Sequence, residues 1–120
     1  MAVEHTVGAL SELPPGSKKV VRAGAIEVGV FNVDGELYAL PNVCPHQFGP
    51  LCKGIVSGTV VARPETGFKP TWVHEGRIVV CPWHALEFDV TTGRCVAFPK
   101  LKLRQYRVRV DDGGMVRLLA

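Results

Sequence analysis

The chain has 120 residues, of which 47% are hydrophobic, and a formal net charge of +3. That length suits one domain with a small core and leaves no room for a second, catalytic domain. The mild charge does not favour a nucleic-acid partner, and no apolar run reaches the roughly 20 residues of a membrane helix. The start, residues 1–5, lacks the features of a secretory signal. We therefore expect a cytoplasmic protein without a membrane or nucleic-acid partner.

The first third of the chain reads as short strands between Gly, Pro and Asp turns, rich in β-branched and aromatic residues. No window of a dozen residues keeps a helical period. Asp34-Gly35 is a typical two-residue hairpin turn. The expected strands are Val3 to Leu10, Lys18 to Arg22, Ala25 to Asn32 and Glu36 to Pro41.

The last part of the chain predicts two further strands, Arg104 to Asp111 and Met115 to Leu119, around a Gly-containing turn. Together, the two ends of the chain predict one antiparallel β unit. From Lys100 to Val110 basic and apolar residues alternate, and the parity changes after Arg104. A bulge near Gln105 would keep all five basic residues outside. We interpret them as a solvated face, with docking to an acidic partner as the alternative.

The middle of the chain holds two Cys/His pairs, Cys44-Pro45-His46 and Cys81-Pro82-Trp83-His84. Cysteines in a cytosolic chain indicate metal or redox chemistry more often than disulfides. Two thiolates and two imidazoles could hold a tetrahedral zinc. However, each pair supplies one ligand of each kind, which lets both sulfurs bind one iron and both imidazoles bind a second. The pattern favours this mixed two-iron arrangement, and zinc remains the alternative.

The two boxes, with Gly49-Pro50-Leu51 after the first and Glu87-Phe88-Asp89 after the second, resemble the cluster-binding boxes of small Rieske ferredoxins. The resemblance covers roughly residues 4 to 118. It implies one [2Fe-2S] cluster, with Cys44 and Cys81 on the inner iron and His46 and His84 on the outer iron.

The resemblance also implies an all-β Rieske fold, in which an antiparallel β-sandwich base carries an inserted cluster-binding subdomain with two ligand loops. On this reading residues 1–120 are a single Rieske domain, with base 1–41 and 94–120 and subdomain 42–93. The 34 residues between His46 and Cys81 exceed the family's usual spacing. We expect them to form an extended hairpin at about 55–80.

Besides this long gap, the sequence departs from the family pattern at Ala85 and in the missing partner of Cys52. Ala85 stands where the family has Gly, so a positive φ there would strain the loop by about 1 kcal/mol. Trp83 stands where some Rieske proteins place the second half of an inter-loop disulfide, so Cys52 has no such partner. High-potential members have Ser and Tyr hydroxyls where this chain has Leu86 and Phe88, which predicts a low potential.

The resemblance implies a one-electron carrier with no catalytic residues, a component of a dioxygenase or monooxygenase system. It would pass electrons from a reductase to an oxygenase or similar acceptor, and we expect a monomer. Around the outer iron we expect a small, largely apolar rim that includes Gln47, Phe48, Pro50 and Leu86. The alternatives are a small subunit of a larger reductase, like that of nitrite reductase, and a zinc-stabilised interaction module.

The remaining chemically notable residues have structural interpretations. We expect Cys52 and Cys95 to be inert packing residues, and His5 and His74 to lie at the surface. Trp72 is expected in the core, and Trp83 behind the cluster loop.

Overall fold

The computed structural model describes residues 3–44, 49–62, 64–83 and 85–120, leaving the side chain of residue 66 aside. Within these ranges the chain forms strands and short 3-10 turns, which confirms the all-β prediction. No helix of the described residues has the length and hydrophobicity to cross a bilayer. The strands are β1 (Glu4–Ala9), β2 (Lys18–Ala23), β3 (Ile26–Val33), β4 (Glu36–Pro41), β5 (Ile55–Val61), β6 (Thr71–Val80), β7 (Glu87–Asp89), β8 (Arg107–Val110) and β9 (Met115–Leu119), and the 3-10 turns are η1 (Leu10–Glu12), η2 (Leu51–Lys53) and η3 (Pro64–Thr66).

Strands β2, β3 and β4 form one antiparallel sheet in sequence order, and the hairpin between β3 and β4 is the predicted one. The turn between β3 and β4 forms because Asp34 (φ 53°) and Gly35 (φ 95°) both take the left-handed conformation that a tight hairpin of this kind requires. The side chain of Asn32 accepts a 2.8 Å hydrogen bond from the amide of Gly35 and holds the turn closed.

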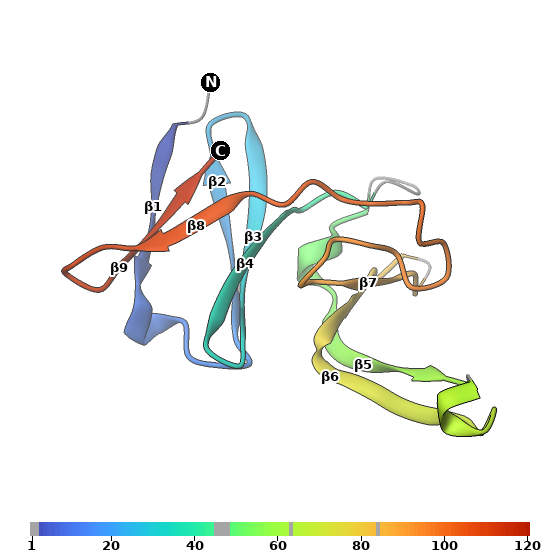
Figure 1. Ribbon diagram of the computed structural model, residues 1–120. Helices are drawn as coiled ribbons and strands as arrows, with labels where there is room; N and C mark the ends of the chain where they lie inside the picture. Colours follow the sequence, from blue (N-terminus) through green and yellow to red (C-terminus); the bar gives the residue numbers. More distant parts are fainter. Residues whose placement is uncertain (1–2, 45–48, 63, 84) are drawn as a thin grey trace.

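Strands β1, β9 and β8 form a second antiparallel sheet that joins the two ends of the chain. Figure 1 shows it beside the β2-β3-β4 sheet, and apolar side chains from both sheets meet in one buried cluster. The two ends of the chain therefore form one β unit, as the sequence predicted. The buried cluster is made of Val7, Leu13, Ala23, Val28, Val30, Ala39, Val116 and Leu118.

The basic segment before β9 follows the predicted alternation but forms less strand than expected. Strand β8 begins only at Arg107, and before it the backbone pairs at isolated bridges such as Arg94 with Lys102. Arg104 and Gln105 are both exposed, so the chain changes face at this point. The regular ladder fails here because the chain is crossing from one part of the molecule to the other (Figure 1).

A third sheet, β5-β6-β7, lies to one side of the other two in Figure 1. Strands β5 and β6 form an antiparallel hairpin, paired from Ile55 with Val80 to Val61 with Thr71, with an irregularity between Ser57 and Thr59. In Figure 1 the far end of this hairpin projects away from the rest of the molecule. This gives the molecule an elongated shape, 47 × 29 × 22 Å.

The expectation that Trp72 lies in the core is wrong. Its side chain is 55% exposed, and its indole Nε1 donates a 2.6 Å hydrogen bond to Glu75 Oε2 at the surface. The indole lies over Gly58, where an added Cβ would sit 2.8 Å from ring atoms. The projecting hairpin offers no further layer against which Trp72 could be buried.

Candidate metal centre

A second hydrophobic cluster joins the third sheet to the base, and all four cysteines lie in it. Phe31 and Leu40 enter it from β3 and β4, and Val79 and Phe88 enter it from β6 and β7. Cys44 follows β4 after two residues, and Cys81 directly follows β6. Both thiols of the predicted ligand set are only 2% exposed. The fold therefore brings Cys44 and Cys81 into one dry environment.

The two cysteines enter loops that the main chain closes in the same way. The amide of Cys44 donates a 2.8 Å hydrogen bond to Gly49 O, and the amide of Cys81 donates a 2.9 Å hydrogen bond to Leu86 O. Each bond therefore joins a cysteine to the carbonyl five residues later. A further 2.9 Å bond from Ala85 N to Cys81 O tightens the second loop.

Gly49 is where the two loops meet. A Cβ on Gly49 would sit 3.3 Å from Cys81 Sγ and 2.8 Å from two ring carbons of Trp83. Only a residue without a side chain fits between the thiol and the indole. Trp83 therefore covers Gly49 rather than packing behind the loop as expected, and its side chain remains 56% exposed.

Ala85, which stands where the family has Gly, takes the strained conformation that this difference suggested. Its φ is 57°, in the left-handed region that ordinary residues avoid. The chain accepts this conformation because the reversal after Cys81 needs it: the bonds from Cys81 N and Ala85 N both depend on the turn. The backbone at Ala85 therefore has the positive φ for which strain was expected.

The side chains that follow the second loop are apolar. Leu86 is half-buried and packs against the cysteine-containing cluster, and Phe88 is completely buried within it. Neither carries a hydroxyl that could donate a hydrogen bond to sulfur. Pro50, from the other loop, is half-buried next to Gly49.

Several predicted site residues lie outside the described residues: His46 and His84 among the ligands, and Gln47 and Phe48 in the rim. Within the part of the chain that the structure describes, no three Cys, His, Asp or Glu side chains gather as a metal site. The structure thus buries Cys44 and Cys81 in one hydrophobic cluster, and the assignment of all four ligands remains a prediction.

Cys52 and Cys95 are buried, unbridged thiols, as expected for packing residues. Burial raises the pKa of Cys52 to about 12, which keeps its thiol neutral. The thiol lies 3.4 Å from Pro41 O and 3.5 Å from Leu40 O. Among the described residues Cys52 forms no disulfide.

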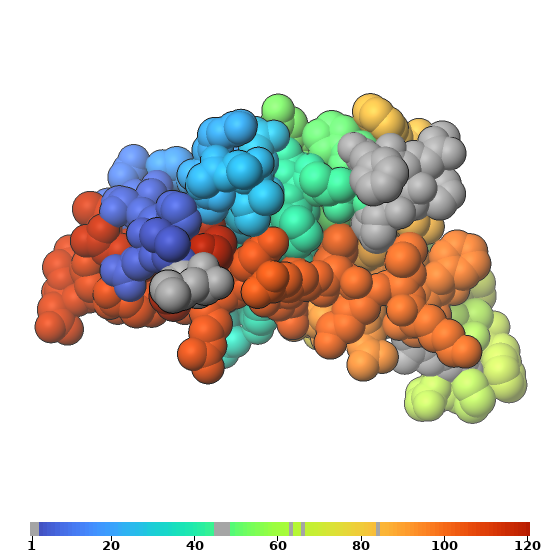
Figure 2. Space-filling model, turned by 90° about the horizontal axis from the view of Figure 1, so that it is seen from above, coloured from blue at the N-terminus to red at the C-terminus, as the bar shows by residue number. Residues whose placement is uncertain are grey.

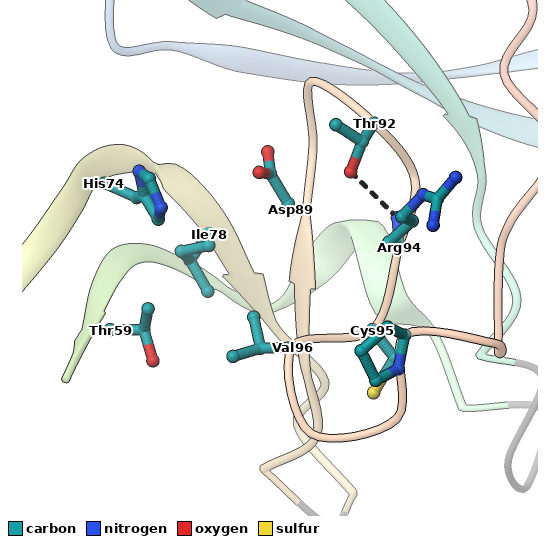
Figure 3. A pocket seen from close by; sticks show the side chains of 9 residues that line it. Thr59, His74, Ile78, Asp89, Thr92, Arg94, Cys95 and Val96 are labelled. Atoms are coloured by element: carbon teal, nitrogen blue, oxygen red, sulfur yellow. Dashed lines mark hydrogen bonds between the residues drawn. The ribbon is translucent and has the colours of Figure 1, made fainter. Parts of the chain in front are cut away.

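A cavity of about 250 Å³ between the β5-β6 hairpin and the loop after β7 is a feature that the sequence did not predict (Figure 3). His74 lines the cavity and has a φ of 59°. It is half-buried, so it is less exposed than expected. Asp89 lies at the same cavity, and its carboxylate accepts a 2.7 Å bond from Arg77. Burial alone would raise the pKa of Asp89, but hydrogen bonds from Arg77 and Thr91 hold that pKa below its usual value. These contacts tie β7 to β6.

One protein-family model matches most of the chain. The model of the Rieske [2Fe-2S] domain family matches residues 3–107. Among curated proteins, the chain is 31% identical over 104 residues to the ferredoxin component of a naphthalene 1,2-dioxygenase/salicylate 5-hydroxylase system from Ralstonia sp.. That alignment covers 86% of this chain and 83% of the relative.

Two solved structures share the fold over nearly the full length. The ferredoxin of carbazole 1,9a-dioxygenase from Nocardioides aromaticivorans is 30% identical with a TM-score of 0.69, covering 98% of this chain and 96% of that one. A chain described as an NADH-dependent nitrite reductase small subunit from Mycobacterium tuberculosis is 24% identical with a TM-score of 0.72, covering 100% and 96%. At that identity the second likeness shows the fold alone.

The described part of the site fits a Rieske-type [2Fe-2S] cluster. Such a cluster takes two thiolates and two imidazoles, and sulfur ligands suit an environment that excludes water. Cys44 and Cys81 supply two buried sulfurs on adjoining loops, and Gly49 keeps the space beside Cys81 Sγ clear of side-chain atoms. An imidazole occurs in each of the same two loops in the sequence.

Proposed function

Because the chain belongs to the Rieske [2Fe-2S] domain family, we propose that it is a ferredoxin that carries single electrons from a reductase to an oxygenase-type acceptor. The observation that carries this proposal is the match to ferredoxin components of dioxygenase systems over more than four-fifths of both chains. A further solved structure that is 26% identical to this chain, with a TM-score of 0.71, is a complex of ferredoxin and oxygenase. It supports an oxygenase-type acceptor.

The proposed ligands of the cluster are Cys44 and Cys81 on the inner iron and His46 and His84 on the outer iron. The burial of both thiols supports this division, because it places the sulfur-bound iron away from water. We also propose that residues 42–93 are the cluster-binding subdomain and that residues 1–41 and 94–120 are its base. The grouping of β5, β6 and β7 into a separate sheet supports that division.

When bound, the cluster supplies reversible one-electron chemistry, and the chain sets its surroundings. Potential in this cluster class spans about −150 to +300 mV and responds to charge, solvent and hydrogen bonds to sulfur. Leu86 and Phe88 cannot donate such bonds, so we propose a potential at the lower end. Electrons would leave through a small rim that includes Gln47, Phe48 and Pro50, which suits short-lived encounters.

The carrier role, with no catalytic residues, rests on the ferredoxin relatives. A role as a reductase subunit has weaker support, because the likeness to the nitrite reductase small subunit shows only a fold. A zinc site conflicts with the family match and with one Cys and one His in each loop. The cytoplasmic location remains a prediction from the sequence, in which we found no features of a secretory signal or membrane helix.

The test is spectroscopic and uses the purified holoprotein. A Rieske cluster makes the protein red-brown and, once reduced, gives the EPR signal of mixed thiolate and imidazole ligation, whereas zinc leaves the protein colourless and EPR-silent. Substitution of Cys44, Cys81, His46 or His84 should abolish or transform the signal. The matched control is Cys52→Ala, which removes a buried thiol of the same cluster of side chains and should leave the signal unchanged. A colourless wild type, or loss of signal in the control alone, would contradict the assignment.

A further inference from the structure

We propose that six basic residues between positions 94 and 109 form a docking strip for an acidic surface of a protein redox partner. The basic strip consists of Arg94, Lys100, Lys102, Arg104, Arg107 and Arg109, all exposed. The inference rests on the proposed electron-carrier function and adds the charge of the partner and the surface that it contacts.

The charge of the chain is divided unevenly. The strip holds six of the 14 Lys and Arg residues, and no Asp or Glu occurs from Val90 to Val110. The rest of the sequence has eight basic residues against eleven acidic ones, so it is net negative. Protein surfaces usually intersperse both signs, and a single-sign field is typical of surfaces that steer a charged partner.

Alternating apolar residues fix the backbone of the strip to both parts of the molecule. Leu101 and Leu103 pack into the cluster that contains Cys44 and Cys81. Tyr106 and Val108 pack against the core of the base. The intervening basic side chains are exposed. Figure 2 shows this segment, in orange, as a band along one edge of the face seen from above.

Most of the strip's positive charge is uncompensated within the molecule. Arg109 forms an ion pair with Glu4 at 2.8 Å, and Arg104 lies over the ring of Tyr106 at 5.1 Å from its centroid. Across the described residues, the other four cations of the strip form no ion pair with a carboxylate. Their field is thus available to a partner.

The position of the strip favours a protein partner over nucleic acid. Its first half is bonded to the loop that follows β7, through Cys95 N to Leu101 O (2.9 Å) and Leu103 N to Gly93 O (2.8 Å). A partner on the strip would therefore lie beside the subdomain that holds the redox centre. Long-range charge raises the rate of encounter without a large interface, which suits a carrier that must also dissociate quickly.

The experiment compares two one-electron acceptor proteins of opposite charge with the reduced holoprotein in stopped-flow measurements. The probes are plastocyanin, which is acidic, and cytochrome c, which is basic. With plastocyanin, we expect the second-order rate to fall about tenfold between 20 and 300 mM NaCl, as screening shortens the range of the field. Lys100→Glu/Lys102→Glu should lower the low-salt rate with plastocyanin at least tenfold and raise the rate with cytochrome c.

The matched control is Arg22→Glu, which reverses one exposed cation on β2 of the base. It is compared with Lys102→Glu alone, which makes the same change of total charge and should have a several-fold larger effect. Equal effects of the two single variants would show that only net charge matters and would overturn the strip. A second combination of results would overturn the proposal in favour of nucleic acid. In it, the rate with plastocyanin changes neither with salt nor in the two strip variants, and the wild type binds a 20-base-pair DNA duplex tightly whereas the variants do not. The visible spectra of the wild type and of each variant are recorded first. A wild type without a cluster contradicts the proposed function, whereas an intact cluster with rates that do not depend on charge rejects only the strip.

Discussion

Replacing Ala85 with Gly should stabilise the loop that follows Cys81. A left-handed conformation costs a non-glycine residue about 1–2 kcal/mol, and Ala85 has a φ of 57°. Glycine removes that cost but gives the unfolded chain extra freedom, worth about 0.4–1 kcal/mol. The difference is a net gain of about 1 kcal/mol, which corresponds to roughly a fivefold change in an equilibrium constant.

The assay is the rate of cluster bleaching in guanidinium chloride, because cluster loss makes unfolding irreversible. Ala85→Gly should slow bleaching by up to about fivefold, as the equilibrium gain sets the limit. The control is Ala97→Gly: Ala97 is also exposed, but it is not one of the described residues with positive φ, so glycine there should speed bleaching. If both variants shift the rate in the same direction, strain at Ala85 does not explain the result.

Three further sets of variants test the surroundings of the site. Leu86→Ser/Phe88→Tyr should raise the voltammetric midpoint within the roughly −150 to +300 mV range of this cluster class, because each new hydroxyl can donate a hydrogen bond; an unchanged midpoint would refute this account. Gly49→Ala should destabilise the protein by about 1–3 kcal/mol through overpacking and should speed bleaching. Adding Trp83→Ala should reverse most of that effect, because two of the three atoms nearest to a Cβ on Gly49 belong to Trp83. Failure of this rescue would place the clash elsewhere. The pKa of Cys52 is raised to about 12 in the folded state. The stabilisation from its buried neutral thiol is therefore complete below pH 9 and is lost as the pH rises toward 12. Over that range the guanidinium midpoint of the wild type should fall more steeply than that of Cys52→Ala, and parallel curves would argue against a buried neutral thiol.

The sequence predicted the base of the fold well because its signals are local. Alternating β-branched residues and two-residue turns specify hairpins, and Asp34-Gly35 formed the expected turn. The paired Cys/His boxes likewise identified the family, whereas their role as ligands remains a prediction. The parity change after Arg104 correctly predicted which side chains face outward, although regular pairing begins only at Arg107.

What the sequence did not predict depends on whether a second layer is present. Trp72 was expected in the core because it is large and apolar, but its position on the projecting hairpin leaves it exposed. Trp83 contacts Gly49 from the other loop, a tertiary contact that no local pattern encodes. The cavity lined by His74 and Asp89 forms where the hairpin and the loop after β7 meet, so it too follows from packing between distant segments.

The matched main-chain bonds at the two loops bear on how the protein is assembled. Cys44 N to Gly49 O and Cys81 N to Leu86 O tie each loop without using any atom that would bind iron. In small zinc domains the metal itself gathers the ligands and drives folding. Here main-chain hydrogen bonds close both loops, so the metal is not the sole link that holds either of them.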